Sequence, residues 1–278
     1  MSLYKGKLLS IGSNPKINKS DKSGKGFKTA ILHLSPHKLS GKNFCPNASK
    51  GCIKGCLNTS GHGRFDKTQE ARLRRSHFFI KDRSGFMKQL SKEIEAFEKH
   101  CKKRKLKPAI RLNGTSDIPW ENIKFEVLRT KPNHHGSCVS FELNIFQRFS
   151  NVQFYDYTKS KRRVLKSDLP SNYHLTFSRS ETTPIKDIRE VLDNGKNVAV
   201  VFDHLPDDEF GFPFEPHHFL DTSITGGRDW CINGDRTDLR FLDKCFDLKG
   251  DEIKGFVVCL SAKGKAKKDK SGFVVKIY

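Results

Sequence analysis

Short apolar runs alternate along the chain with longer amphipathic segments. Runs rich in apolar and β-branched residues, which are typical of buried strands, occupy residues 27–34, 109–112, 152–157, 173–178, 197–203 and 255–261. In residues 66–79, 84–106 and 184–192 the apolar positions recur every three or four residues, which predicts helices. Residues 120–129 and 139–149 are also predicted to be helical.

This alternation of strand and helix predicts a parallel sheet with right-handed crossovers. A complete eight-stranded barrel usually takes about 250 residues, and this chain spends many of its 278 residues on loops. We therefore expect an α/β fold, a partial parallel β/α barrel of about six strands, in a single domain spanning residues 1–278. Residues 3–11 are expected to form an edge strand, and residues 273–278 are expected to pair with it.

A cysteine-rich loop at residues 44–63 follows the first predicted core strand. Cys45, Cys52 and Cys56 lie within twelve residues, with six and then three residues between them. In parallel α/β sheets, functional sites assemble in the loops at the carboxyl ends of strands, so this loop is well placed for chemistry. Three thiolates in one loop predict a bound metal ion or iron–sulfur cluster.

The three cysteines favour a 4Fe–4S cluster as the bound group. A structural zinc site normally takes four ligands, often as two closely spaced pairs, and this loop has no second pair. Three thiolates on a four-iron cluster leave one iron open to a substrate, a cofactor or a fourth side chain. Zinc is the second alternative, because a histidine close in sequence can complete its coordination shell; the candidates are His33, His37 and His62. The third alternative is a loop that binds no metal.

A second polar stretch, N-G-T-S-D, ends the strand predicted at residues 109–112. Gly114, Thr115, Ser116 and Asp117 are candidate cofactor-binding residues, because small polar residues at a strand end can bind an amine or a carboxylate. The alternative is that Ser116 or Asp117 caps a following helix.

A third polar stretch contains Asp235 and Asp238. These carboxylates offer acid–base or cofactor contacts, or they belong to ordinary turns.

The chain is strongly basic, with 52 Lys and Arg against 31 Asp and Glu, a net charge of +21. Such an excess favours an anionic partner, most commonly DNA or RNA, although a merely soluble basic surface is the alternative. The basic residues occur in several runs, including 102–105, 159–166 and 263–270, which form a phosphate-binding surface if they converge. Aromatic side chains that can stack on bases are Phe65, Tyr155, Tyr157 and Trp230.

No apolar run approaches the 18 residues expected of a membrane span, and the first residues lack a secretory apolar core. Of the eight cysteines only three cluster in sequence, so the others are expected to be buried, reduced thiols. Together these features favour a reducing cytoplasm.

Five sequence blocks resemble gene product 88, a family of phage and plasmid proteins. The blocks are C-P-N-A-S-K-G-C-I-K-G-C-L-N-T-S-G-H-G, R-L-N-G-T-S-D-I-P-W-E, Q-F-Y-D-Y-T-K, N-G-D-R-T-D-L-R-F-L-D and L-S-A-K-G-K-A, and they lie between residues 27 and 268. The resemblance implies a phage-encoded protein in the cytoplasm of an infected bacterial host.

More distantly, the arrangement is similar to that of radical S-adenosylmethionine enzymes. In those enzymes a loop after the first barrel strand holds three cluster cysteines, and a glycine-rich motif after the second strand meets the methionine amino group. The resemblance implies that Gly114, Thr115 and Ser116 approach S-adenosylmethionine, although the spacing of the cysteines differs from the usual three and two.

The predicted function is thus that of an iron–sulfur protein with a radical or redox activity. The alternative is a nucleic-acid-binding module with a structural metal.

Overall fold

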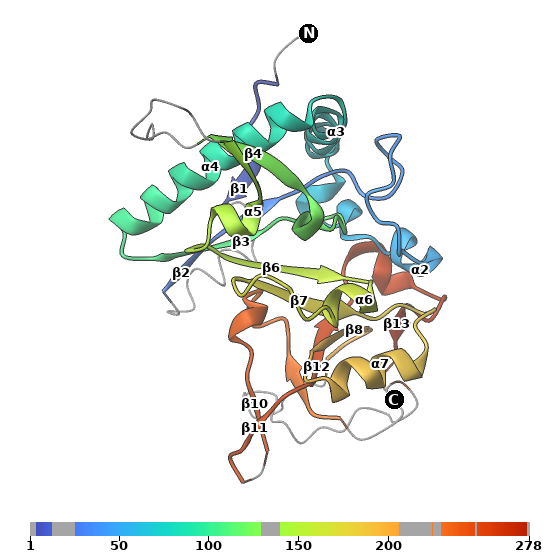
Figure 1. The fold of residues 1–278 in the computed structure, drawn as a ribbon. Coiled ribbons are helices and arrows are strands. Elements are labelled where there is room, and N and C mark those ends of the chain that lie inside the picture. Colours follow the sequence, from blue (N-terminus) through green and yellow to red (C-terminus); the bar gives the residue numbers. More distant parts are fainter. Residues whose placement is uncertain are drawn as a thin grey trace.

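The structure, a computed structural model, describes residues 4–12, 26–128, 140–205, 224, 229–247 and 249–276. Its centre is a nine-stranded, mostly parallel sheet (Figure 1). The strands are, in order across the sheet, β1 (Leu9–Ile11), β2 (Phe27–Leu32), β3 (Lys107–Arg111), β6 (Gln153–Thr158), β7 (Tyr173–Ser178), β8 (Val198–Phe202), β12 (Val257–Ser261) and β9 (Cys231–Asn233), with β13 (Val274–Val275) beside β8.

Six neighbouring parallel strands follow one another in chain order, from β2 through β3, β6, β7 and β8 to β12. β1 is antiparallel to β2 at one edge, and β9 runs parallel to β12 at the other. Because consecutive strands are neighbours and parallel, the loops that leave their carboxyl ends gather along one edge of the sheet.

Helices lie in the crossovers between β2 and β8, and their apolar side chains pack with those of the sheet in one core. The α-helices are α2 (Lys50–Lys54), α3 (Asp66–Lys81), α4 (Arg83–Lys103), α5 (Ile145–Arg148), α6 (Lys161–Val164) and α7 (Ile185–Asp193). Short 3-10 helices are η1 (Leu57–Thr59), η2 (Gly61–Arg64), η3 (Trp120–Asn122), η4 (Arg240–Leu242) and η5 (Gly264–Lys268).

The main core lies between the sheet and these helices. In α4, Phe86, Leu90, Ile94 and Phe97 repeat at the spacing of one helix face, and all four are buried. They belong to the same apolar cluster as alternate residues of the central strands, such as Phe154 of β6. The period of two in the strands and of nearly four in the helices therefore decides which side of each element is buried.

Most of the elements predicted from the sequence are confirmed. β2, β3, β6, β7, β8 and β12 lie within a residue or two of the predicted strands, and α3, α4 and α7 match the predicted helices. β1 confirms the edge strand predicted at residues 3–11. In the described part of the chain, no helix combines the length and the apolarity that a bilayer span requires.

The helices predicted at residues 120–129 and 139–149 are wrong. Apart from η3 and α5, the described residues there form an antiparallel hairpin of β4 (Lys124–Leu128) and β5 (Ser140–Asn144). Phe125 and Val127 alternate with Lys124 and Glu126, a period of two that favours a strand with one buried face.

The predicted pairing of the last segment with the N-terminal strand is also wrong. β13 instead pairs in parallel with the end of β8. β7 pairs with Val198 and Ala199 at the start of β8, and β13 pairs with Val201 and Phe202 at its end. A hairpin of β10 (Cys245–Phe246) and β11 (Glu252–Ile253) was not predicted. Most of residues 204–230 lie outside the described residues.

Candidate functional site

The loops that leave β2 and β3 are joined by hydrogen bonds at the carboxyl edge of the sheet. The Gly114 N–H donates to the Leu32 carbonyl at 3.0 Å, and the Thr115 hydroxyl donates to the Leu34 carbonyl at 2.5 Å. The Asp117 N–H donates to the Phe44 carbonyl, next to Cys45, at 2.8 Å. The structure therefore brings the two candidate stretches, the cysteine loop and the N-G-T-S-D turn, into direct contact.

Glu181, which follows β7, holds the middle of the cysteine loop. Its carboxylate accepts hydrogen bonds from the Ser49 hydroxyl at 2.6 Å and the Gly51 N–H at 2.7 Å, at the start of α2. Burial raises the pKa of this carboxyl, but the hydrogen bonds from Ser49, Gly51 and the Glu181 N–H, together with the charge of Lys159, lower it more, so that the net pKa lies below its ordinary value. The Ser49 hydroxyl in turn accepts from the Cys52 N–H at 3.1 Å, which fixes the helix turn that carries this cysteine.

Cys45, Cys52 and Cys56 are free, half-buried thiols in one electrostatic neighbourhood. The Cys45 sulfur lies 3.4 Å from the His37 N–H, which donates to it, and 3.8 Å from the Thr115 carbonyl, which accepts from it. The Asn58 N–H donates to the Cys56 sulfur at 3.5 Å. Backbone N–H groups aimed at cysteine sulfurs stabilise thiolates and tune the metal centres bound to them.

Burial and, to a lesser extent, the charges of Cys56, Asp117 and Cys52 raise the pKa of the Cys45 thiol to about 12, although the hydrogen bond from the His37 N–H opposes the shift. The pKa values of Cys52 and Cys56 are also raised, mainly by burial, and the nearby ammonium of Lys159 opposes both shifts. Each pair of the three cysteines interacts in this way. Because thiols bind metals as thiolates, a cation at this site would have to displace their protons.

The described residues contain no group of three or more His, Cys, Asp or Glu side chains that could hold a metal ion. The three histidines named as alternative zinc ligands lie in different surroundings. His33 is nearly buried, and burial together with the charges of Arg72 and Arg111 lowers its pKa to about 3. His37 contributes its backbone N–H, and His62 is exposed, with its ring against Phe65.

Lys159 lies at the exit of β6 and connects three of the strand ends. Its N–H donates to Asp117 at 3.0 Å, and its ammonium donates to the Ser178 hydroxyl at 3.1 Å and the Arg179 carbonyl at 3.1 Å. Burial lowers its pKa, and the charges of Cys52, Asp117 and Glu181 oppose this. Lys159 thus places one positive charge beside the thiols.

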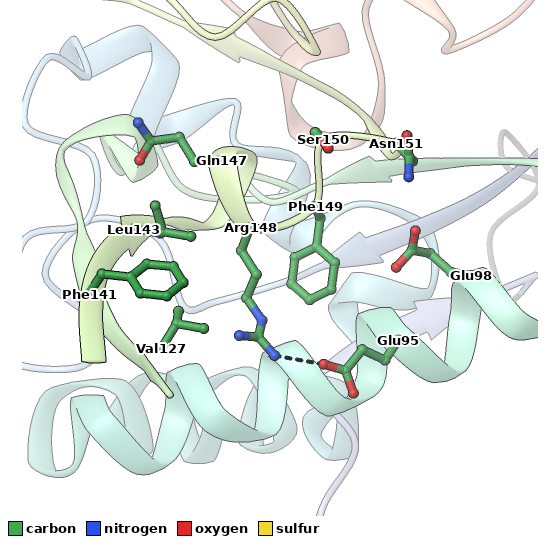
Figure 2. A pocket seen from close by; sticks show the side chains of 10 residues that line it. All are labelled: Glu95, Glu98, Val127, Phe141, Leu143, Gln147, Arg148, Phe149, Ser150 and Asn151. Carbon is green, nitrogen blue, oxygen red and sulfur yellow. Dashed lines mark hydrogen bonds and ion pairs between the residues drawn. The ribbon is translucent and has the colours of Figure 1, made fainter. Parts of the chain in front are cut away.

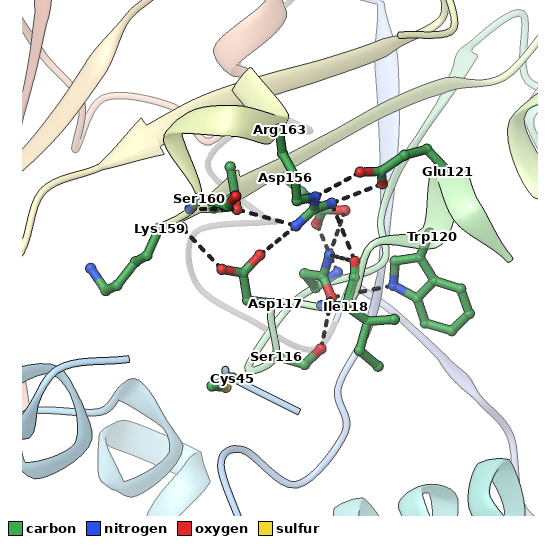
Figure 3. A network of polar contacts seen from close by, with 12 residues as sticks. Cys45, Ser116, Asp117, Ile118, Trp120, Glu121, Asp156, Lys159, Ser160 and Arg163 are labelled. Atoms are coloured by element: carbon green, nitrogen blue, oxygen red, sulfur yellow. Dashed lines mark hydrogen bonds and ion pairs between the residues drawn. The ribbon is translucent and has the colours of Figure 1, made fainter. Parts of the chain in front are cut away.

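The N-G-T-S-D turn is held by a buried polar network (Figure 3). Asn113 accepts from the Ser116 hydroxyl at 2.9 Å and from the Ile118 N–H at 2.9 Å, and its own N–H donates to Asp156 at 2.7 Å. Ser116 therefore stabilises the turn itself, and its hydroxyl is already committed. Among the candidate cofactor-binding residues, Thr115 contacts the Cys45 thiol through its carbonyl, and the Asp117 carboxylate acts electrostatically on Cys45 and Cys52.

Arg163 closes this network from α6. It donates to the Asp117 carboxylate at 2.5 Å and to the Glu121 carboxylate at 2.7 and 2.9 Å. All three side chains are at most 11% exposed. Sequence reasoning missed Arg163, Glu121, Lys159 and Glu181 as parts of this site, because nothing in the local pattern indicates which distant charges will meet.

Gly114→Ala should destabilise the protein by about 1–3 kcal/mol, because a Cβ there would overlap its neighbours. It would stand 2.6 Å from Cγ2 of Ile31 and 2.8 Å from the Leu32 carbonyl oxygen, and the backbone oxygen cannot rotate away. Urea unfolding measures the change. Gly41→Ala is the control, since a Cβ at Gly41 meets nothing within 4 Å and carries only the strain of its φ of +83°. An equal or larger loss at Gly41 would contradict the packing explanation.

Asp156, at the centre of the network, predicts a pH dependence of stability. Burial raises its pKa to about 7, against the opposing charge of Arg111 and the hydrogen bond from Asn113. The folded state therefore binds this proton more tightly than the unfolded state, so the contribution favours folding below about pH 4 and is lost as the pH rises through about 7. Asp156→Asn should flatten the fall in the urea midpoint across this range; an unchanged slope would show that other groups cause it.

Asp235 and Asp238 do not join the thiol site. Asp235 accepts from the Ser261 N–H and from Lys263, each at 2.9 Å, and so ties the exits of β9 and β12 together. Asp238 forms an ion pair with Arg111, the last residue of β3, at 3.1 Å. Both positions are explained by these structural contacts.

The four aromatic side chains that were expected to stack on bases differ in their exposure. Tyr155 is fully buried, and Tyr157 lies under the Arg111 guanidinium, 4.8 Å from its ring centre, so neither is presented to a partner. Trp230 packs partly buried against the apolar cluster around Val258. Phe65 is half-exposed, in the cysteine-loop region.

A separate hollow of about 370 Å³ lies between α4, α5 and the β4–β5 hairpin (Figure 2). Arg148 crosses it to pair with Glu95 at 2.7 Å, and the apolar wall includes Phe141 and Leu143. No residue of the cysteine loop or of the N-G-T-S-D turn lines this hollow.

Comparison with known proteins places the chain in a family. No curated protein and no solved structure matches it. The family model described as gene product 88 matches residues 7–277, almost the whole chain. The protein with this cysteine loop and mostly parallel sheet therefore belongs to the gene product 88 family.

Proposed function

We propose that this protein is an iron–sulfur protein that binds a 4Fe–4S cluster through Cys45, Cys52 and Cys56. The observation that carries the proposal is the position of three free thiols, interacting in pairs, beside the N-G-T-S-D turn at the carboxyl edge of the sheet. Backbone N–H groups of His37 and Asn58 point at two of the sulfurs. This combination of thiol donors and N–H···S contacts suits an iron–sulfur centre.

A cluster suits this geometry better than a single zinc ion. Zinc ligands all lie about 2.0–2.3 Å from one point, so their donor atoms must be tightly grouped. In a four-iron cluster each cysteine binds a different iron, and the sulfurs stand farther apart. The loop supplies three free thiols and no second cysteine pair, which suits three irons of a cluster better than the four ligands of a structural zinc site.

When bound, the cluster would supply electron transfer or a Lewis-acidic open iron. The residues around it have separate tasks: Glu181 and Ser49 fix α2, Lys159 offsets negative charge, and Asp117 anchors the neighbouring turn. The chain-order run of six parallel strands supports the further proposal of a partial β/α barrel with the cluster at its carboxyl end.

We extend the proposal to S-adenosylmethionine as a second ligand at the β3 exit. Cys45 lies against the Thr115 carbonyl, so a ligand on an open iron would meet the backbone of Gly114 and Thr115. The Thr115, Ser116 and Asp117 side chains are bonded within the protein, so this contact would depend on main-chain groups.

Purification without oxygen, followed by iron and sulfide analysis and an ultraviolet–visible spectrum, tests the cluster. We expect about four irons and four sulfides per chain and an absorption band at about 400 nm. A colourless protein with stoichiometric zinc would refute the cluster. Adding S-adenosylmethionine to the reduced protein then tests the extension: cleavage to methionine supports it, and an intact cofactor with an unchanged cluster spectrum opposes it.

The second candidate function is a nucleic-acid-binding module in which the metal only stabilises the loop. The net charge of +21 favours it. The two functions are compatible, because a cluster protein can act on nucleic acid.

A further inference from the structure

The cysteine loop is surrounded by exposed basic side chains from segments far apart in sequence. We call this set the basic collar; it consists of Lys50, Lys54, Arg64, Lys67, Lys265, Lys267 and Lys268. The first four flank or follow the cysteines on α2, η2 and α3, and the last three are on η5. Every member is exposed to solvent.

Close packing between η5 and the cysteine loop brings these segments together. A Cβ placed on Gly55 would lie 3.2 Å from the Cβ of Ala266, and one placed on Gly264 would overlap the Ser60 side chain. Figure 1 shows the same arrangement, with the C-terminal segment after β12 beside α2. The lysine-rich run at residues 263–270 therefore lies next to the thiols.

The charges of the basic collar are not neutralised by ion pairs within the described residues, whereas other lysines of the protein are paired. Lys161, for example, binds Asp187 and Glu190 at 2.7 and 2.6 Å. The nearby acidic residues include Glu181, whose carboxylate accepts from Ser49 and Gly51, Asp66 at the start of α3, and Asp269. The Asp269 carboxylate is occupied by the Ser271 hydroxyl and the Val274 N–H.

Apolar side chains are exposed among these cations. Ile53, Leu57 and Phe65 are 39%, 51% and 50% exposed. The Arg64 guanidinium lies 5.5 Å from the Phe65 ring centre, so an aromatic face and a cation are presented together. Cations around an exposed aromatic ring are the combination by which proteins hold single-stranded nucleic acid, with phosphates on the charges and a base on the ring.

We propose that single-stranded DNA or RNA docks on the basic collar, with a base stacked on Phe65. Duplex nucleic acid keeps its bases paired and inaccessible to an exposed ring, so the apolar side chains favour a single strand. An anionic lipid surface would use the charges but not the stacking geometry of Phe65. The inference rests on the proposed function in one respect only, that the bound strand lies beside the cluster.

Binding of a fluorescent single-stranded oligonucleotide to the anaerobically purified full chain, titrated at several salt concentrations, tests the proposal. Replacing Lys265, Lys267 and Lys268 together by Ala should lower the slope of log K against log salt by about two, since each phosphate contact in a single strand contributes about 0.7. The matched control replaces Lys99, Lys102 and Lys103, which are exposed at the far end of α4, by Ala and should leave the slope unchanged.

Phe65→Ala should weaken binding roughly tenfold without changing the salt slope, and Phe65→Trp should retain it. Equal losses for the η5 and α4 lysine variants, tighter binding to duplex than to single strand, or binding only to anionic vesicles would overturn the proposal. Iron and sulfide are measured on the same samples. Binding without a cluster refutes the proposed function alone, and a cluster without binding refutes this inference alone.

Discussion

Replacing Cys45, Cys52 and Cys56 together by Ser is expected to abolish iron binding and the absorption band at about 400 nm. Serine keeps the size of each side chain but removes the thiolate donor. The turn around Cys52 is held by hydrogen bonds among Ser49, Gly51 and Glu181 that do not involve sulfur. At Cys45 and Cys56 a serine hydroxyl can accept in place of the sulfur from the backbone N–H groups of His37 and Asn58. The loop is therefore expected to keep its path, and circular dichroism should be unchanged.

The matched control is Cys101→Ala. Cys101 is buried in the main core at the end of α4, so its replacement should lower the urea midpoint but leave the iron content intact. Iron retained in the triple serine variant, or lost equally in the control, would contradict the assignment of the ligands.

Arg163→Ala is expected to cause the largest loss of stability of any single substitution considered, about 3–5 kcal/mol. The guanidinium is 11% exposed and pairs with two carboxylates, of Asp117 and Glu121, that are at most 11% exposed. Its removal leaves both buried charges without their cationic partner, which costs more than the ion pairs themselves contribute. Urea unfolding followed by circular dichroism measures the change.

Arg74→Ala provides the control for removing a cation from an ion pair. Arg74 and Glu70 lie 3.3 Å apart, but both side chains are more than 60% exposed, so the expected change is within about 0.5 kcal/mol. Comparable losses at the two positions would show that burial does not decide the cost. Arg163→Lys should recover only part of the loss, because an ammonium cannot reproduce the paired contacts to Glu121.

The central strands could be predicted because a strand that is buried on both faces is a continuous apolar run, as in β8, V-A-V-V-F. The β4–β5 hairpin was mistaken for helices because two short amphipathic strands contain as many apolar residues as one helix. The partner of β13 could not be predicted either. Its two valines could pair with the edge of any strand. They pair with Val201 and Phe202 of β8 because the pairing of β7 with β8 ends before these residues.

The contact between the cysteine loop and the N-G-T-S-D turn followed from one rule, that parallel strands release their exit loops at the same edge. The supports of that contact could not be predicted. Glu181 and Arg163 lie 130 and 46 positions from the groups that they bind, Gly51 and Asp117. A single sequence carries no pattern for pairs so far apart.

The packing of η5 against the cysteine loop also sets the order of events during synthesis. Cys56 leaves the ribosome 208 positions before Gly264, the first residue of η5. At about 5–20 residues per second, translation takes roughly 10–40 seconds to cover that interval. Until then the cysteine loop lacks its packing partner, so a cofactor that requires the packed loop would be inserted only after η5 has been synthesised.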